Sequence, residues 1–330
     1  MAAAEQIKSL IRSFSEGDDA RFYATAMQIA AAEAKKGHIV FAEELRKLID
    51  KAKQEHSIFA LKIQRTIPIA SPRGELSDLL EVFYPKAKLR DMILSPEVQN
   101  SLQRIVTEQR KFEILKQHDL HPRRKLLLIG KPGCGKTKTA QALAGELGLV
   151  LFIVRLDGLI TKFMGESISK LRLIFNAMNN TRGVYLFDEF DSIGSNRSYG
   201  NDVGEIRRVL NSFLLNIEKD DSQSIIIAAT NRPEALDKAL FRRFDDIITY
   251  PLPGKKELQA TFEKHLVGFK LAGEFTLERA VHEAEGLSYA DVIRSCQEAI
   301  KEMLIHDRKS VSEKSLLSFL KGKRPNEEKS

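Results

Sequence analysis

The sequence lacks several features that would identify whole classes of protein. It contains no tryptophan and only two cysteines, Cys134 and Cys296, too few for a disulfide framework or a cysteine-rich zinc site. No apolar run approaches the roughly 20 residues of a membrane-spanning helix. Glu5 and Lys8 interrupt the apolar core that a signal peptide would require. These absences predict a protein of a reducing, cytoplasmic compartment.

Candidate metal-binding and proteolytic motifs are also missing from the sequence. The His-Glu-x-x-His pattern of zinc proteases does not occur. The seven histidines are scattered, and His118 and His121 have no third candidate ligand nearby. We expect these two histidines to lie at a helix end. Any peptidase that works with this protein is then a separate chain.

The charge distribution does not favour nucleic acid as a partner. Of the 330 residues, 43% are hydrophobic and 29% are charged, which excludes disorder along the whole chain. The formal net charge of +7 is spread over the sequence without a basic arm. Nucleic-acid binders usually concentrate their charge on one face or arm. Only a patch assembled by folding would change this expectation.

The N-terminal part of the chain predicts a small helical bundle followed by a linker. Apolar residues recur at helical spacing in three stretches, and Gly37 separates the second stretch from the third. Such a bundle either packs passively or docks a partner, and we interpret residues 1–56 as a docking module. Residues 57–88 are predicted to be a linker, because their prolines exclude a long helix.

Residues 89–254 have the pattern of an α/β domain. A helix is predicted from Pro96 to about Gln117, with Ser95 as its N-cap. Five apolar runs then alternate with helical stretches, which is typical of a parallel sheet covered on both faces. The predicted strands are Leu126–Ile129, Val150–Val154, Val184–Phe187, Ile225–Ala229 and Ile247–Tyr250. Residues 255–322 are predicted to form a small α-helical domain broken at Gly286, and residues 323–330 a polar tail.

A phosphate-binding loop follows the first of these strands. Residues Gly130–Thr137 fit the pattern G-x-x-x-x-G-K-[ST] between a strand and a helix, the context that distinguishes a P-loop from a chance match. Lys136 is expected to reach the β- and γ-phosphates of ATP, and Thr137 to hold Mg²⁺. The alternative, a glycine-rich turn without a ligand, is disfavoured by this context.

Two carboxylates, Asp188 and Glu189, follow the predicted strand 184–187. A P-loop enzyme needs an acid at such a strand end to hold Mg²⁺ through its water shell, and Asp188 suits this role. Glu189 is then placed to polarise the attacking water. The alternative is a solvated strand end, but the position downstream of a P-loop favours the catalytic interpretation.

Six ordered segments resemble the motifs of the AAA ATPase family within the AAA+ superfamily, over about residues 89–320. They are Gly130–Thr137, Asp188–Ile193, Gly204–Leu214, Ala228–Pro233, Leu236–Asp245 and Gly286–Val292. The resemblance implies an ATP-hydrolysing enzyme whose P-loop sheet is flanked by helices and followed by a helical lid. It also implies a homo-oligomeric ring, most often a hexamer, with each site at a subunit interface.

The resemblance assigns roles to individual residues. Asn231 is expected to orient the attacking water together with Glu189, and a neighbouring subunit to supply Arg242 or Arg243 to the γ-phosphate. The alternative is that both arginines only pair with nearby acids such as Asp245 or Asp246. The residues expected to contact nucleotide are Gly130, Lys131, Pro132, Gly133, Cys134, Gly135, Lys136, Thr137, Lys138, Asp188 and Ala290.

Some positions depart from the family pattern without removing a catalytic group. Lys131 stands where proline is usual, and Cys134 where threonine or serine is usual. The compact pair Arg242-Arg243 is similar to the shorter segment of katanin and spastin relatives. This similarity does not decide which of the two is the primary arginine finger, the residue that reaches the γ-phosphate of a neighbouring subunit.

The segment Lys162-Phe163-Met164-Gly165-Glu166-Ser167 resembles the first pore loop of the family. In a ring, Lys162, Phe163 and Met164 would then contact a protein substrate in the central channel. The alternative is that the two apolar side chains belong to the core, which Gly165 and the polar flank disfavour.

Together these features predict a ring motor that remodels, unfolds or threads protein. Two other functions stay open at this stage. One is an AAA+ ATPase acting on nucleic-acid complexes, as loaders and transposition ATPases do; the other is a partner ATPase for a separate protease, in bacterial defence for example. A scaffold that is regulated by nucleotide and hydrolyses ATP slowly is disfavoured, because Glu189, Asn231 and the paired arginines are all present.

Overall fold

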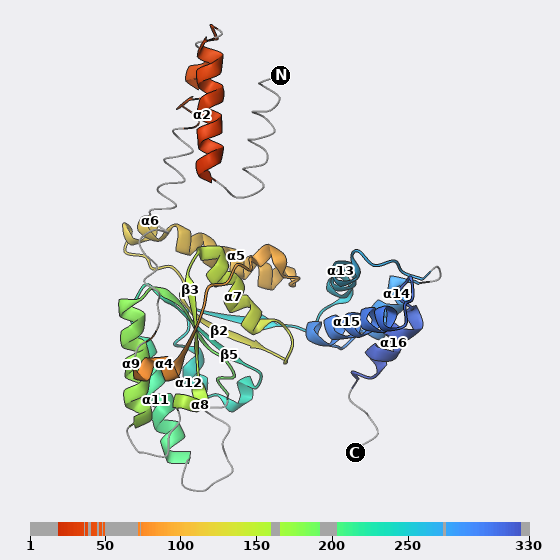
Figure 1. Ribbon diagram of the computed structural model, residues 1–330. Coiled ribbons are helices and arrows are strands. Elements are labelled where there is room, and N and C mark those ends of the chain that lie inside the picture. Colours follow the sequence, from red (N-terminus) through yellow and green to blue (C-terminus); the bar gives the residue numbers. More distant parts are fainter. Residues whose placement is uncertain are drawn as a thin grey trace. The chain divides into compact units, whose positions relative to one another are not determined.

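The computed structural model describes residues 19–35, 37–38, 41–44, 46–47, 49, 72, 74–159, 166–191, 203–272 and 275–324 (Figure 1). The chain forms two compact units, Met1–Ile69 and Ala70–Ser330. In the described part, no helix is both long and apolar enough to cross a membrane.

The first unit contains the helix α2, Asp19–Lys35. It buries the small side chains of Ala26 and Ala30 and ends before Gly37, whose φ is 91°. This confirms the second predicted helix. The first predicted helix lies outside the described residues, and of the third only residues 41–44, 46–47 and 49 are described, all helical.

The second unit is built on a six-stranded sheet with the order β1-β3-β4-β5-β2-β6. Five strands run parallel, and β1 pairs with β3 in the antiparallel sense. The strands are β1 Leu80–Phe83, β2 Lys125–Gly130, β3 Val150–Val154, β4 Gly183–Phe187, β5 Ile225–Thr230 and β6 Asp246–Tyr250. All five strands predicted from the sequence are confirmed to within one residue at each end.

Helices cover both faces of this sheet, so successive strand residues enter different cores. Leu127 packs with α9 and α11, whereas Leu126 and Leu128 pack with α5 and α7 on the opposite face (Figure 1). The elements around the sheet are α4 Glu75–Leu79, η1 Leu89–Asp91, α5 Pro96–Arg110, α6 Phe112–Lys116, α7 Lys136–Leu147, α8 Leu156–Leu159, α9 Glu166–Asn180, α11 Val203–Lys219, η2 Pro233–Ala235 and α12 Lys238–Phe241.

Two sequence-based expectations need correction here. Within the predicted linker 57–88, residues 75–83 form α4 and β1, and all four residues of β1 pair with β3. A strand this short, between Gly74 and Pro85, shows no clear alternation of apolar and polar residues. Its pairing partner also lies far along the chain, so the sequence did not reveal it. The helix expected from Pro96 to Gln117 ends at Arg110, and α6 follows after one turn residue. Its predicted cap is correct, because Ser95 Oγ accepts from the backbone N–H of Val98.

Four further helices form a separate apolar cluster, as predicted for residues 255–322. They are α13 Lys255–Leu266, α14 Leu277–Glu283, α15 Tyr289–Ile305 and α16 Glu313–Lys321. The predicted break at Gly286 has a φ of 86°. We call these helices the lid.

Truncating Leu79 tests whether the unpredicted elements α4 and β1 belong to the core. This side chain is 1% exposed in the cluster shared by the sheet, α9 and α11. Leu79→Ala is expected to lower the free energy of unfolding by ~2–5 kcal/mol, because it leaves a cavity. Urea unfolding measures the change. The control is Leu215→Ala, at a leucine that is 57% exposed on α11. Equal stability of Leu79→Ala and the unchanged chain would contradict the packing described.

Candidate active site

The P-loop connects the end of β2 to the start of α7. Gly133 and Gly135 adopt φ angles of 78° and 99°, which glycine tolerates at little cost. Gly133 also lies close to the lid, since a Cβ there would stand 2.5 Å from Ser288 Oγ. The loop can therefore turn and contact the lid only with glycine at this position.

Lys136 is a buried cation surrounded by acceptors. The residue is 6% exposed, and Nζ donates to the carbonyls of Gly130 at 2.7 Å and Lys131 at 3.1 Å. It also donates to Oδ1 of Asn231 at 2.7 Å. These contacts use all three donors of the ammonium. Burial lowers the pKa of Lys136, although the nearby Asp188 and Asp191 act in the opposite direction.

The two residues expected to share Mg²⁺ lie in contact. Thr137 Oγ1 donates to Oδ2 of Asp188 at 2.6 Å, and both line the same cavity. A hydroxyl and a carboxylate are hard oxygen ligands of the kind Mg²⁺ prefers, so these residues fit the ion. Glu189 is exposed beside them, with a φ of 49°. Positive φ is uncommon for a residue with a side chain and often occurs at functional sites.

Asn231 is held at the end of β5 by Asp191, a residue for which the sequence indicated no role. Oδ1 of Asp191 accepts from Thr230 Oγ1 at 2.9 Å and from the Asn231 N–H at 3.2 Å. These bonds tie the turn after β4 to the end of β5. The predicted catalytic residues Glu189 and Asn231 thus line one cavity with Lys136.

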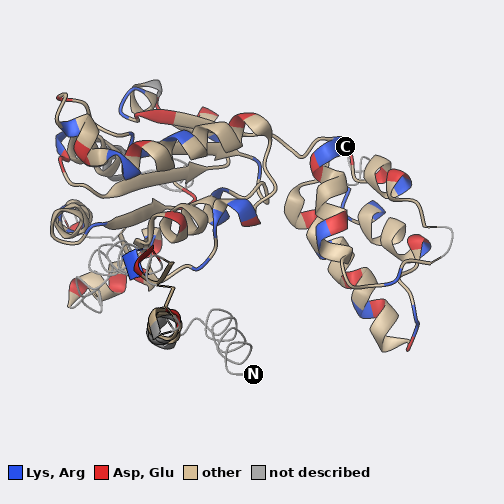
Figure 2. Cartoon of the chain, turned by 90° about the horizontal axis from the view of Figure 1, so that it is seen from above, with Lys and Arg blue, Asp and Glu red and all other residues tan. Residues whose placement is uncertain are grey.

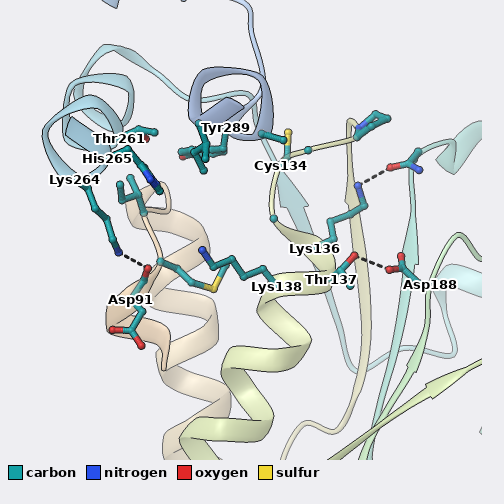
Figure 3. A pocket seen from close by; sticks show the side chains of 18 of the residues that line it. Asp91, Cys134, Lys136, Thr137, Lys138, Asp188, Thr261, Lys264, His265 and Tyr289 are labelled. Atoms are coloured by element: carbon teal, nitrogen blue, oxygen red, sulfur yellow. Dashed lines mark hydrogen bonds between the residues drawn. The ribbon is translucent and has the colours of Figure 1, made fainter. Parts of the chain in front are cut away.

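A cavity of about 380 Å³ lies between the P-loop and the lid. Figure 3 shows Thr261, Lys264 and His265 on one side of it and Lys136, Thr137 and Asp188 on the other. Of the predicted nucleotide contacts, Pro132 to Lys138, Asp188 and Ala290 line it, whereas Gly130 and Lys131 do not. The sequence did not indicate the lining residues Met92, Ile93, Thr261, Lys264, His265, Tyr289 and Ile293.

The lid reaches the P-loop through the start of α15. Ser288 and Asp291 form a capping box there, in which Ser288 Oγ accepts from the Asp291 N–H and donates to its carboxylate. Ala290, two residues after the cap, donates its N–H to the carbonyl of Gly133 at 3.2 Å. The serine and the aspartate of this motif therefore aim the helix start rather than contact a ligand.

A second lid contact fixes the opposite rim. Lys264 Nζ donates to the carbonyl of Asp91, in η1, at 2.6 Å. Met92 and Ile93, which line the cavity, follow directly. Residues far apart in the sequence thus meet around one pocket, and no single local pattern would have found them.

The two predicted arginine fingers lie away from this cavity. Arg242 and Arg243 are not among the described residues that line it. Both precede β6, which runs parallel to β2, and Asp245 N donates to the carbonyl of Lys125 at the start of β2. The P-loop begins at the other end of β2, about 16 Å away along the strand. Neither arginine is thus placed at its own P-loop.

The alternative interpretation was that both arginines only pair with nearby acids such as Asp245 or Asp246. The contacts of these acids test it. Asp245 accepts from the backbone N–H groups of Arg124 and Lys125, and Asp246 pairs with Arg123 at 2.9 Å. Arg243 instead pairs with Glu218, at the end of α11, at 2.5 Å. Arg242 is exposed and has no ion pair among the described residues.

The predicted pore-loop residues Lys162, Phe163 and Met164 lie outside the described residues. Their alternative assignment to the core is therefore not tested. Among the described residues, no group of three or more histidine, cysteine or acidic side chains is arranged to hold a metal ion.

The fold and the cavity together define a P-loop nucleoside triphosphatase. The family model for "ATPase family associated with various cellular activities (AAA)" matches residues 126–252. The Sinorhizobium fredii protein "Uncharacterized AAA family ATPase y4kL" is 36% identical over 318 residues, which span 95% of this chain and 93% of that protein. The chain belongs to the AAA family and is an ATPase.

Two further comparisons cover a smaller share of sequence or concern the fold alone. An "ATP-dependent zinc metalloprotease FtsH" of Borreliella burgdorferi is 30% identical over 251 residues, which are 72% of this chain but only 39% of that protein. The crystal structure of the FIGL-1 AAA domain aligns with a TM-score of 0.61 and 24% identity, over 76% of this chain and 88% of that one. The second likeness supports the α/β fold with its flanking helices.

The titration of His265 tests the charge balance of the cavity. Burial lowers the pKa of His265, and Lys138 and Lys264 lower it further. The neutral ring is therefore favoured in the folded chain. The associated stability is fully present above the unfolded-state pKa and is lost as the pH falls from there through the lower folded-state pKa. Bound ATP or Lys138→Met is expected to raise the pKa, because each makes the surroundings less positive.

NMR titration of the ring protons, assigned with His265→Gln, measures this pKa with and without ATP. A pKa at or above that of free histidine in the unliganded protein, unmoved by Lys138→Met, would contradict the arrangement.

Proposed function

We propose that this ATPase assembles into a ring, most simply a hexamer, and uses ATP hydrolysis to remodel, unfold or thread protein substrates. The observation that carries the proposal is the segment Lys162-Phe163-Met164-Gly165, which connects α8 to α9 in a chain with an assembled nucleotide pocket. An aromatic and an aliphatic side chain provide contact area that does not depend on the substrate's sequence.

ATP hydrolysis is proposed to use residues from three strand ends. Lys136 exchanges its present acceptors for the β- and γ-phosphates, and Glu189 with Asn231 positions the attacking water. Thr137 and Asp188 would hold Mg²⁺, which would supply positive charge to neutralise the phosphates. The tight contact between these two side chains and the shared cavity support this assignment.

We propose that Arg242 acts on the γ-phosphate of a neighbouring subunit. Its distance from its own P-loop, at the opposite edge of the sheet, supports action in trans. Both arginines are exposed, but Arg243 pairs with Glu218 in its own subunit, whereas Arg242 has no ion pair among the described residues. Arg242 is therefore the better candidate for the primary finger, and Arg243 supports the segment that carries it.

The same proposal covers location and domain roles. Both cysteines are free and buried, which supports a reducing compartment such as the cytoplasm. Residues 1–56 are proposed to dock an adaptor or a separate protease, residues 89–254 to bind nucleotide and residues 255–322 to form the lid. The relative named as a protease supports a protein substrate, although this chain spans only 39% of it.

A nucleic-acid substrate is the weaker candidate. Figure 2 shows Lys and Arg interspersed with Asp and Glu on the described helices. Mixed charge of this kind gives little of the attraction to phosphate that dominates nucleic-acid affinity.

Phe163→Ala tests the substrate assignment. The amount of tagged protein unfolded per ATP hydrolysed is expected to fall by about tenfold or more, because the main apolar contact is lost. Loss of native substrate fluorescence is measured beside phosphate release, and Phe163→Tyr, which keeps the ring, is the matched control. Unchanged coupling would disprove threading by this segment. Loss of the fold by circular dichroism would assign Phe163 to the core.

Mixing two inactive variants tests whether Arg242 acts across an interface. Arg242→Ala keeps an intact pocket, and Lys136→Ala keeps an intact finger. Mixed assemblies are expected to recover part of the ATPase activity, because some interfaces then combine both intact parts. Phosphate release is followed over a range of mixing ratios, with Arg243→Ala as the comparison. No recovery at any ratio would contradict action in trans.

A further inference from the structure

The rim segment, residues 88–93, borders the cavity between the P-loop and the lid, and its last two residues line that cavity. One side of this segment is fixed to α7. Lys88 Nζ donates to the carbonyl of Gly145, in α7, at 2.6 Å, and a Cβ on Gly145 would collide with the carbonyl oxygen of Ala87. The rim segment is therefore anchored to the helix that follows the P-loop.

A lid side chain bonds the rim segment from the other side. Lys264 of α13 donates from Nζ to the carbonyl of Asp91 at 2.6 Å. Figure 3 shows this bond across the cavity from the pair Thr137 and Asp188. The carboxylate of Asp91 accepts from the Lys88 N–H at 2.8 Å, so the turn that presents the carbonyl to the lid is itself fixed.

The lid contact at the P-loop is of a different kind. The Ala290 N–H donates to the carbonyl of Gly133 at 3.2 Å, and a Cβ on Gly133 would lie 2.9 Å from the Ala290 Cβ. This contact joins two closely packed backbones. Lys264, by contrast, is exposed and reaches its acceptor through a flexible four-carbon stem. Of these two contacts, the bond to the rim segment is therefore the one that can break while the lid keeps its place at the P-loop.

The surroundings of Lys264 make its bond sensitive to a bound anion. Lys138 and His265 line the same cavity as Lys264, and the charges of both lysines act on the His265 ring, whose pKa they lower. Two like charges near one ring repel each other. The phosphates of a nucleotide would offset this repulsion and so favour the closed arrangement of the lid.

We propose that Lys264 is a positioning residue whose bond to Asp91 latches the lid to the rim segment and slows the release of ADP. ADP is the product of the ATPase reaction, and product release or lid opening limits turnover in many enzymes that close over their substrate. The inference rests on the placement of nucleotide in this cavity that we propose above. It requires neither a ring nor a protein substrate.

Dissociation of ADP that carries an N-methylanthraniloyl fluorophore tests the latch, with excess unlabelled ADP as the chase in a stopped-flow instrument. Lys264→Met keeps the length of the side chain but removes its charge and donors. It is expected to raise the dissociation rate constant about tenfold, the order of factor that one charged hydrogen bond supplies. Lys264→Arg retains a donor and is expected to restore slow release. Lys256→Met removes an exposed cation from the same helix and is the matched control.

A double-mutant cycle with Lys88 separates a latch from a direct contact between Lys264 and phosphate. Lys88→Met releases the rim segment from α7, so a latch to this segment loses its anchor. The effect of Lys264→Met is therefore expected to be smaller in the Lys88→Met background than in the unchanged chain. A lysine that bound phosphate itself would have the same effect in both backgrounds.

The proposal would be overturned by unchanged ADP release in Lys264→Met, by an equal rise in Lys256→Met, or by an undiminished effect of Lys264→Met in the Lys88→Met background. Urea unfolding of Lys264→Met is expected to match that of the unchanged chain. A loss of stability as large as the change in release would assign Lys264 to the fold instead.

The affinity of Lys136→Ala for the labelled ADP tests the proposed pocket separately. Weaker binding by Lys136→Ala together with unchanged release in Lys264→Met would leave the pocket in place and remove only the latch. Unchanged binding by Lys136→Ala would place the nucleotide elsewhere, and both the proposed pocket and the latch would then be wrong.

Discussion

The burial of the Lys136 ammonium at the carboxyl edge of the sheet is the constraint on which the rest of the site depends. A buried cation needs acceptors around it, and these come from its own loop and from Asn231 on β5. Asp191 in turn ties the end of β5 to the turn after β4. A phosphate that binds Lys136 would compete with Asn231 for the ammonium, so nucleotide binding would be felt at the ends of both β2 and β5.

The sheet also separates the P-loop of a chain from the arginine segment that we propose acts on a neighbouring subunit. β2 carries the P-loop at one end, and its other end is bonded to the segment that follows the arginines. A shift of β2 on nucleotide binding would therefore reach the arginine segment of the same chain. In the proposed ring, such a shift would link the state of one pocket to the completion of the next.

The sequence was sufficient to predict those elements in which burial or backbone geometry permits few residue types. The strands β2, β3, β4 and β5 are apolar on both faces, and the P-loop needs glycine at positions such as Gly133, so these features could be predicted. β1 could not, because its four residues depend on pairing with β3. His265 and Met92 were missed because lid packing brings them to the pocket.

The central claim is that a pocket of one chain is completed by an arginine of another. The most direct measurement is ATP turnover per chain over a dilution series, with mass photometry recording the fraction of assembled protein in each sample. The account predicts that turnover follows the assembled fraction and vanishes as monomers predominate, while monomers still bind ATP. Monomers that hydrolyse ATP at the rate of the assembly would contradict it.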